Sequence, residues 1–276
     1  MMISAQHTAS GSGNCVQQSG GQMGKVISVA NQKGGVGKTT TTINLAAALG
    51  EKGKKILVID MDPQGNTSSG FGIDKNKEEN TVYQLFTGDC VIREVIRQQV
   101  APGVDVICSN VNLAGVEVEL FDEPDKNNVL KEAVDYIRDD YDYIMIDCPP
   151  SLSILTINAM VASDSVLVPI QCEYYALEGL SQLIHTINLV KERMNDRLDI
   201  EGIVFTMYDS RTNLSSQVVE NVRENVTQRI YQTVVPRNIR LAEAPSFGQP
   251  ITIYDSKSAG AEAYRKLAEE VIEGKH

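Results

Sequence analysis

The sequence predicts an α/β protein with a doubly wound, mostly parallel sheet that carries helices on both faces. The first observation behind this prediction is a set of short runs rich in Val and Ile, at 26–31, 55–60, 104–109, 141–147, 164–170 and 200–207. Runs without polar alternation are typical of strands covered on both faces, as parallel strands are. The second observation is that helix-like stretches separate most of these runs, at 39–52, 126–139, 154–162, 176–194 and 214–229. Alternating strands and helices indicate right-handed crossovers within one sheet.

The N-terminal segment differs in composition from the rest of the chain. Residues 1–22 are rich in Ser, Gly and Gln and show no periodicity, which is typical of disorder. We therefore expect a disordered tail over residues 1–23 and one domain over residues 24–276.

Composition argues against several classes of protein. No run approaches the ~20 apolar residues of a membrane span, and the start of the chain lacks the pattern of a secretory signal. Five scattered cysteines without a CxxC pair favour reduced thiols in the cytoplasm over a disulfide or metal framework. The formal net charge of −11 argues against a broadly basic nucleic-acid binder but not against a local basic patch.

The first strand and the first helix are joined by a glycine-rich segment, NQKGGVGKTT at 31–40. A strand, a glycine-rich turn and a helix opening with Lys and Thr are the context of a phosphate-binding loop. The glycines let backbone N–H groups approach phosphate oxygens, and the start of the helix adds its positive dipole end. Lys38 is expected to bridge the β- and γ-phosphates of ATP, and Thr39 to coordinate Mg²⁺. Gln32 stands where this pattern has its leading glycine, and a second cation, Lys33, follows it.

Two further predicted strands end in carboxylates. Asp60 and Asp62 follow the run KILVI, and Asp147 follows YIMI. Ligands of open α/β sheets gather at the carboxyl ends of the strands, and a carboxylate after an apolar run is the Walker B arrangement for Mg²⁺. The alternative is a strand-end Asp that caps a following turn or helix. We expect a magnesium site formed by Thr39, Asp60 and Asp147.

The segment KGGVGKTT, with Lys33 before the glycines, resembles the deviant Walker A motif of the ParA/MinD group of P-loop ATPases. The similarity continues through DMDPQGNTSSGFG, IDCPPSLSILTINAM, TMYDSRTNLS and VPRNIRLAEAPSFGQPI, which resemble ParA-type chromosome-partitioning ATPases of the Soj branch. It covers the chain from Met23 to about residue 270.

The resemblance implies a role for the extra lysine. Two ATP-bound subunits would face each other, and Lys33 of each would reach the phosphates of the other, so that ATP controls a homodimer and hydrolysis to ADP and phosphate releases it. Lys33, Lys38 and Asp62 would be catalytic, and Asp62 would orient the attacking water. The phosphates would be held by Lys33, Gly34, Gly35, Val36, Gly37, Lys38, Thr39 and Thr40. The adenine would be contacted by Met207, Pro236, Arg237 and Asn238.

The resemblance also implies an output for the ATP switch. Arg211 and Arg240 match arginines implicated in nonspecific DNA binding, where they would contact phosphates without reading bases. Arg237, Lys257, Arg265 and Lys266 would extend this patch if they share its face. The expected partners are DNA of the nucleoid and a ParB-type centromere-binding protein, in the partitioning of a chromosome or a plasmid.

The sequence argues against membrane binding and against an iron–sulfur cluster, and it leaves two other functions open. The C-terminal stretch AEAYRKLAEEVIEGKH lacks the basic amphipathic character of a membrane-binding helix, and its Ala263, Leu267 and Val271 are expected to pack on the domain. Cys148 is expected to be a core residue, not a ligand of an iron–sulfur cluster. A ParA-like positioning ATPase with a protein complex as its output remains an alternative, as does a metabolic P-loop enzyme such as those that make dethiobiotin.

Overall fold

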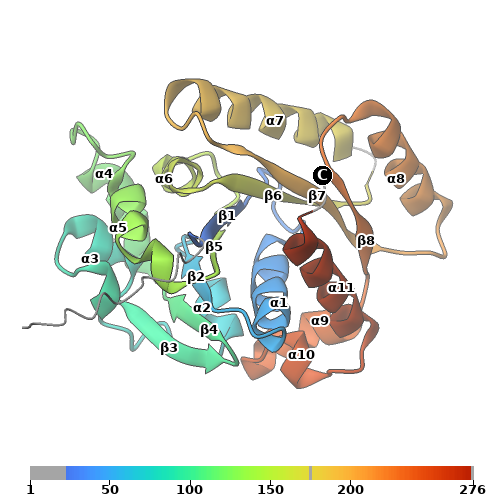
Figure 1. The fold of residues 1–276 in the computed structure, drawn as a ribbon, viewed down its shortest axis with the longest axis horizontal. Helices are drawn as coiled ribbons and strands as arrows, with labels where there is room; N and C mark the ends of the chain where they lie inside the picture. The colour runs from blue at the N-terminus through green and yellow to red at the C-terminus, as the bar shows by residue number, and fades with distance from the viewer. Residues whose placement is uncertain (1–22, 174–175, 275–276) are drawn as a thin grey trace, which may run out of the picture.

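The computed structural model describes residues 23–173 and 176–274 (Figure 1), so the predicted tail lies outside the described residues except for Met23. One mixed sheet of eight strands forms its centre, in the order β3-β4-β2-β5-β1-β6-β7-β8. All neighbouring strands are parallel except the pair β3 and β4. The strands are β1 (Lys25–Val29), β2 (Ile56–Asp60), β3 (Ile96–Ala101), β4 (Val104–Ile107), β5 (Tyr143–Asp147), β6 (Ser165–Gln171), β7 (Asp199–Tyr208) and β8 (Ile230–Pro236).

Helices cover both faces of the sheet, as the uninterrupted apolar runs predict. Side chains alternate between faces along a strand, so that Val26 of β1 joins one core and Ile27 the other. The core of Val26 includes side chains from α3 (Val82–Thr87), α5 (Val129–Ile137), α6 (Ile154–Ala162), α7 (Ala176–Arg193) and α8 (Asn213–Asn225). The core of Ile27 includes those from α1 (Lys38–Glu51), α9 (Ile239–Glu243), α10 (Ile251–Tyr254) and α11 (Ala259–Glu273). Two further short helices are α2 (Asn66–Gly70) and α4 (Val116–Glu119).

The six predicted strands and five predicted helices all form, with shifted ends. The helix expected over 214–229 ends at Asn225, and β8 follows. The sequence prediction missed β3 and β8, the two edge strands of the sheet. The middle of β3 is exposed and polar, so it does not share the apolar texture by which the inner strands are found.

The C-terminal helix packs on the domain, as predicted. Ala263, Leu267 and Val271 of α11 are buried in the same core as α1. No helix in residues 23–173 and 176–274 has the length and apolar character needed to span a bilayer.

Candidate nucleotide-binding and catalytic site

The glycine-rich loop follows β1 near the middle of the sheet. Gly35 and Gly37 have φ values of 76° and 87°, in the left-handed region that glycine occupies without strain. A Cβ built at Gly34 or Gly35 would meet nothing within 4 Å, so the space in front of both residues is open. The leading N–H groups of α1 have no partner within the helix and point into this region. The loop is therefore shaped to receive an anion at a helix N-terminus.

The cleft in front of the loop has a volume of ≈ 420 Å³. The cleft is lined by Gly34, Gly35, Gly37, Lys38, Thr39, Thr40, Asp62, Gln64, Asn66, Pro150 and Met207. It thus brings the predicted loop residues together with Asp62. Lys33 and Val36 are the exceptions among the residues predicted to hold the phosphates. The side chain of Val36 is buried, and its carbonyl accepts a hydrogen bond of 2.7 Å from Thr206 Oγ1.

Lys38 is a buried cation at the base of the loop. Its side chain is nearly inaccessible, and Nζ donates a hydrogen bond of 3.2 Å to the carbonyl of Lys33. Burial lowers the pKa of Lys38, while the nearby carboxyl of Asp147 acts in the opposite direction. The ammonium group is held in place before any ligand binds.

Asp147 lies directly beneath the loop, at the carboxyl end of β5. Its Oδ2 accepts hydrogen bonds from Thr39 Oγ1 at 2.8 Å and from Thr67 Oγ1 at 2.6 Å. Two of the three residues expected to form the magnesium site, Thr39 and Asp147, are thus within hydrogen-bond distance of each other. Thr67 comes from α2. No local pattern predicts its role, because the contact depends on how the segment after β2 folds back.

Asp60 is the register neighbour of Asp147 in the adjacent strand β2. Its Oδ2 accepts hydrogen bonds from the backbone N–H of Ser68 at 2.8 Å and from Ser68 Oγ at 2.7 Å. Both carboxyls are fully buried, and burial raises the pKa of each. Neither Asp60 nor Asp147 lines the cleft itself. Asp147 contacts the loop through Thr39, whereas the carboxylate of Asp60 accepts its hydrogen bonds from Ser68 and from the backbone N–H of Asp62.

Asp62 differs from Asp60 in that it faces the cleft. Its side chain is partly exposed, and its Oδ1 accepts a hydrogen bond of 2.9 Å from the backbone N–H of Gln64. A carboxylate that is fixed by its own turn and open to solvent is suited to hold a water molecule near the phosphates.

The residues fit a magnesium ion of the kind that nucleotides bring with them. Thr39 and Asp147 offer hydroxyl and carboxylate oxygens, which are hard donors of the type that Mg²⁺ prefers. Among the described residues, no group of three or more His, Cys, Asp or Glu side chains is arranged to hold a metal alone. This agrees with Mg²⁺, which binds few protein ligands and completes its shell with water and phosphate oxygens.

A narrower hollow of ≈ 240 Å³ adjoins the phosphate cleft and shares Gly37, Thr40 and Met207 with it. All four residues predicted to contact adenine, Met207, Pro236, Arg237 and Asn238, line this hollow. The sequence prediction missed Thr206, Leu241 and Tyr264, which also line it. Tyr264 lies within 3.2 Å of Thr41 Oγ1 through its hydroxyl, so α11 is tied to the helix that follows the loop.

Lys33 does not line the phosphate cleft in the single chain. It is exposed and forms an ion pair with Glu173, which follows β6. Glu173 was not foreseen, because the pairing depends on where the end of β6 meets the loop. The resemblance implies that Lys33 contacts the nucleotide of a second subunit. In the single chain Lys33 is instead paired with a carboxylate of its own chain.

Arg211 and Arg240 follow the carboxyl ends of neighbouring strands, β7 and β8. Both are exposed, and both are paired within the chain: Arg211 with Asp209 at 2.7 Å, and Arg240 with Glu243 at 2.9 Å. The backbone N–H of Arg237 donates to Tyr208 at 2.9 Å, which links the two segments. They lie at the same edge of the sheet as the phosphate cleft.

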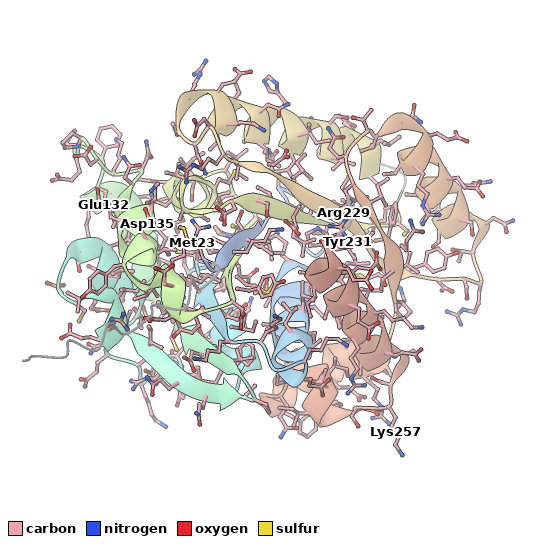
Figure 2. The ribbon with its side chains drawn as sticks, in the orientation of Figure 1. Met23, Glu132, Asp135, Arg229, Tyr231 and Lys257 are labelled. Atoms are coloured by element: carbon pink, nitrogen blue, oxygen red, sulfur yellow. The ribbon has the colours of Figure 1, made fainter. Side chains whose placement is uncertain are left out.

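The further cations that were expected to extend this patch do not all share its face. Lys257 is exposed and points away from the body of the molecule in Figure 2. Arg265 is paired with Glu51 at 2.7 Å. Lys266 lines a different hollow, at the amino ends of β7 and β8, so it does not share the face of Arg211 and Arg240.

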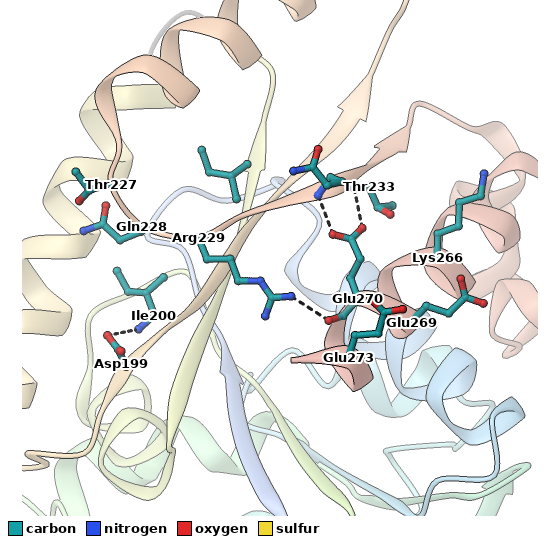
Figure 3. A pocket seen from close by; sticks show the side chains of 12 residues that line it. Asp199, Ile200, Thr227, Gln228, Arg229, Thr233, Lys266, Glu269, Glu270 and Glu273 are labelled. Carbon is teal, nitrogen blue, oxygen red and sulfur yellow. Dashed lines mark hydrogen bonds between the residues drawn. The ribbon is translucent and has the colours of Figure 1, made fainter. Parts of the chain in front are cut away.

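That hollow is the largest of those described here, at ≈ 860 Å³, and is shown in Figure 3. Several of its charged side chains have partners within the chain. The carboxylate of Glu270 accepts hydrogen bonds of 2.8 Å from the backbone N–H groups of Gln232 and Thr233. Arg229 donates to the carbonyl of Glu270 at 2.9 Å and lies over the ring of Tyr231 at 4.6 Å. These contacts close the exposed edge of β8 and leave no chemistry comparable to that of the glycine-rich loop.

Cys148 is buried in the core on the α5–α8 face. Burial raises the pKa of its thiol, which disfavours the thiolate that a metal or cluster ligand requires. This geometry agrees with the predicted core role.

The fold and the glycine-rich site define the class of the protein: it is a P-loop ATPase. Residues 24–200 match a family model described as an AAA domain. The chain is 52% identical over 249 residues to the sporulation initiation inhibitor protein Soj of Bacillus subtilis, covering 90% of this chain and 98% of that protein. It is 50% identical over 250 residues to the chromosome partitioning protein ParA of Caulobacter vibrioides, covering 90% and 94%.

A solved structure with the same fold is that of cobyrinic acid a,c-diamide synthase from Mycobacterium smegmatis with bound ADP and magnesium. Its TM-score is 0.80 at 35% identity, covering 91% of this chain and 94% of that one. The agreement in sequence with the partitioning proteins is higher and spans nearly their whole length. The chain belongs to the Soj/ParA family of chromosome-partitioning ATPases.

Proposed function

We propose that the chain is an ATP-driven switch that forms a dimer with ATP, binds DNA nonspecifically and is reset by hydrolysis of ATP to ADP and phosphate. The observation that carries the ATPase part is the stack beneath the open glycine-rich loop: buried Lys38, and Thr39 bonded to Asp147 at 2.8 Å. Mg²⁺, held by Thr39 with Asp147 behind it, would neutralise charge on the phosphates. The relative from M. smegmatis, which carries ADP and magnesium, supports this assignment.

The proposed chemistry assigns separate roles to the residues of the cleft. Lys38 and the N–H groups of the loop bind the β- and γ-phosphates and stabilise the charge that develops during phosphoryl transfer. Asp62 orients the attacking water from the open side of the cleft. The hollow lined by Met207 and Pro236 receives the base. Thr40 belongs to both hollows and lies where phosphates and base meet.

The proposed dimer follows from the position of Lys33. In the single chain this lysine is exposed beside the mouth of the loop and does not line its own cleft. Two chains that face each other with ATP between them would exchange these lysines, and each would meet the phosphates of its partner. Loss of the γ-phosphate would weaken that contact and release the dimer.

The proposed DNA contact rests on Arg211 and Arg240. They extend from adjacent strand ends at the edge that holds the nucleotide, so a dimer formed across that edge would present two copies of each. Intramolecular partners hold both guanidinium groups, which fixes them in place but lowers the charge that they offer to phosphates. Screening confines the field of a surface charge to about 8 Å at physiological salt, so this patch can act on a chain of net charge −11.

The proposed setting is the partitioning of a chromosome or plasmid, with the protein in the cytoplasm and associated with the nucleoid. A ParB-type centromere-binding protein would stimulate hydrolysis and return the switch to its free state. The family names support this setting.

The test is retention of DNA by the purified full chain with ATP, with ADP and without nucleotide, across a salt series. We expect retention with ATP alone, and a linear fall of the logarithm of the binding constant with the logarithm of salt concentration. Retention that ignores the nucleotide would contradict the switch. ATP-dependent dimers that retain no DNA in any state would leave the ATPase in place and move the output to a protein complex.

A further inference from the structure

A hollow of ≈ 530 Å³ lies between α3 and the segment that joins α4 to α5. Its floor includes the buried side chains of Leu85 and Phe86. Four carboxylates stand around it, those of Glu119, Glu123, Asp125 and Glu132. We call this hollow the acidic groove. Figure 1 shows α3, α4 and α5 at the end of the molecule opposite α8.

Large apolar side chains are exposed in the chain segment that leads into the groove. Val111, Val118 and Phe121 have exposed fractions of 73%, 79% and 71%. Single exposed apolar residues are common on protein surfaces and need no explanation. Three of them occur within residues 111–121, and Val118 and Phe121 directly flank Glu119 and Leu120 of the groove. Such a concentration is typical of a surface that another molecule covers.

The charges around the groove are only partly neutralised. Glu123, Asp125 and Glu132 form no ion pair with another residue in the described part of the chain. Figure 2 shows Glu132 and Asp135 on α5; Asp135, outside the groove, is paired with Lys131. The cation that lines the groove, Lys126, lies over the ring of Phe121 at 5.1 Å and donates to the carbonyl of Phe121. Glu119 accepts a hydrogen bond of 2.9 Å from the hydroxyl of Tyr83.

We propose that the acidic groove is a docking site for a basic amphipathic helix of a protein partner. Such a helix places apolar side chains on Phe121 and the floor of the groove, and its flanking Lys or Arg residues meet the unpaired carboxylates. A second copy of this chain fits less well, because a two-fold contact would bring the same carboxylates together. DNA is disfavoured as well, because its phosphates would meet the same carboxylates.

The position of the groove separates it from the proposed DNA contact. The groove lies on the side of the sheet order that ends in β4 and β3, whereas Arg211 and Arg240 follow β7 and β8 at the other end. A partner helix in the groove therefore leaves the two arginines open. The proposal does not depend on ATP hydrolysis or on DNA binding.

The probe is a fluorescein-labelled synthetic peptide of roughly 15 residues, long enough to form a helix, with Leu at positions i, i+3, i+4 and i+7 and Lys elsewhere. Its binding to the full chain is followed by fluorescence anisotropy at physiological salt. We expect saturable binding, protection of residues 82–87 and 116–132 in hydrogen exchange, and no binding of the same peptide with Glu in place of Lys. Phe121→Ser is expected to lower the affinity at least about fivefold, the scale of an aromatic anchor.

The charge variant is Glu123→Lys combined with Asp125→Lys, which changes two exposed and unpaired side chains in a turn. It is expected to lower the affinity about tenfold or more. The matched control is Glu220→Lys with Glu224→Lys on α8, which changes the net charge equally but lies beyond the screening length, and is expected to change the affinity less than about twofold. Equal losses in both variants, or no saturable binding, would overturn the proposal. A groove that is occupied by a second copy would show itself as self-association that Phe121→Ser abolishes without peptide, and this outcome would also overturn it.

Discussion

The two ends of the parallel strands carry hollows of opposite character. At the amino ends of β7 and β8 lies the hollow of ≈ 860 Å³. Several of its charged side chains are paired within the chain: Glu270 with the edge of β8, Lys266 with Glu262 and Glu269 with Lys52. At the carboxyl ends, the cleft of ≈ 420 Å³ is smaller, yet it holds an open glycine-rich loop and a buried lysine. Polar groups without a partner therefore indicate a binding site better than the volume of a hollow does, because a ligand stabilises the groups that the chain leaves unpaired.

Lys38→Ala in the smaller cleft is expected to change ATP binding strongly. Removing a buried cation that meets phosphates is expected to weaken ATP binding by about 2–5 kcal/mol, or roughly 30-fold to several-thousandfold. Lys266→Ala in the larger hollow is the matched control and is expected to leave ATP affinity unchanged. Isothermal titration with a nonhydrolysable ATP analogue measures both. Equal affinities for the two variants would remove the distinction between the hollows.

The next effect separates binding from chemistry within the cleft. Asp62→Ala is expected to lower the rate of ATP hydrolysis by about 10²- to 10⁴-fold, the range for loss of a positioned general base or water-orienting group, and to accumulate the ATP-bound dimer. ATP affinity should persist, because Asp62 is not part of the loop. Asp74→Ala, in the turn after α2, is the control, and its rate should match the unchanged chain. Undiminished turnover in Asp62→Ala would exclude the water-orienting role.

A third variant tests whether the carboxyl edge of the sheet also binds DNA. Arg240→Glu is expected to abolish DNA retention at physiological salt while ATP-dependent dimerisation persists. Arg240→Ala should lower the slope of log affinity against log salt by about one for each phosphate contact that is lost. Arg93→Glu is the control for the change of charge. Arg93 is exposed, is paired with Asp140 at a distance of 2.6 Å, and does not follow β7 or β8. DNA affinity that survives Arg240→Glu at low salt would exclude this arginine from the contact.

The inner strands of the sheet and the core of the site follow from the sequence, whereas the edge strands do not. Inner strands such as β2 and β5 are recognisable because both faces are buried and their residues are almost all apolar. The edge strand β3 carries exposed Arg97 and Gln98, so its pattern resembles a loop. The same holds within the site: Lys38, Thr39 and Asp147 follow from the order of residues along strand, loop and helix. Contacts made by segments that fold back do not follow from local spacing.

Thr67 and Glu173 are the clearest cases of such contacts. Thr67 reaches Asp147 from a five-residue helix, and that helix has too few residues to show a period. Glu173 meets Lys33 across 140 residues of sequence. Both became visible only when the packing of α2 and of the end of β6 was known.

A weaker effect is expected when the contact between Glu173 and Lys33 is broken. Lys33 and Glu173 are both about half exposed, at 44% and 42%, so their ion pair is worth about 0.2–1 kcal/mol. Breaking it with Glu173→Gln leaves Lys33 free to meet a second nucleotide. ATP-dependent dimerisation, measured by sedimentation at several protein concentrations, is therefore expected to strengthen by up to about fivefold.

A double-mutant cycle gives this small change its meaning. In a Lys33→Ala background, Glu173→Gln should have no effect on dimerisation, because the group that it releases is absent. An equal shift in both backgrounds would mean that Glu173 acts on the interface by its own charge. If dimerisation weakens instead, the carboxylate aids assembly, and the lysine is not restrained by it. Only an increase in dimerisation that requires Lys33 supports the view that Glu173 restrains this lysine in the free chain. The lysine would then be released when ATP and a second chain bind.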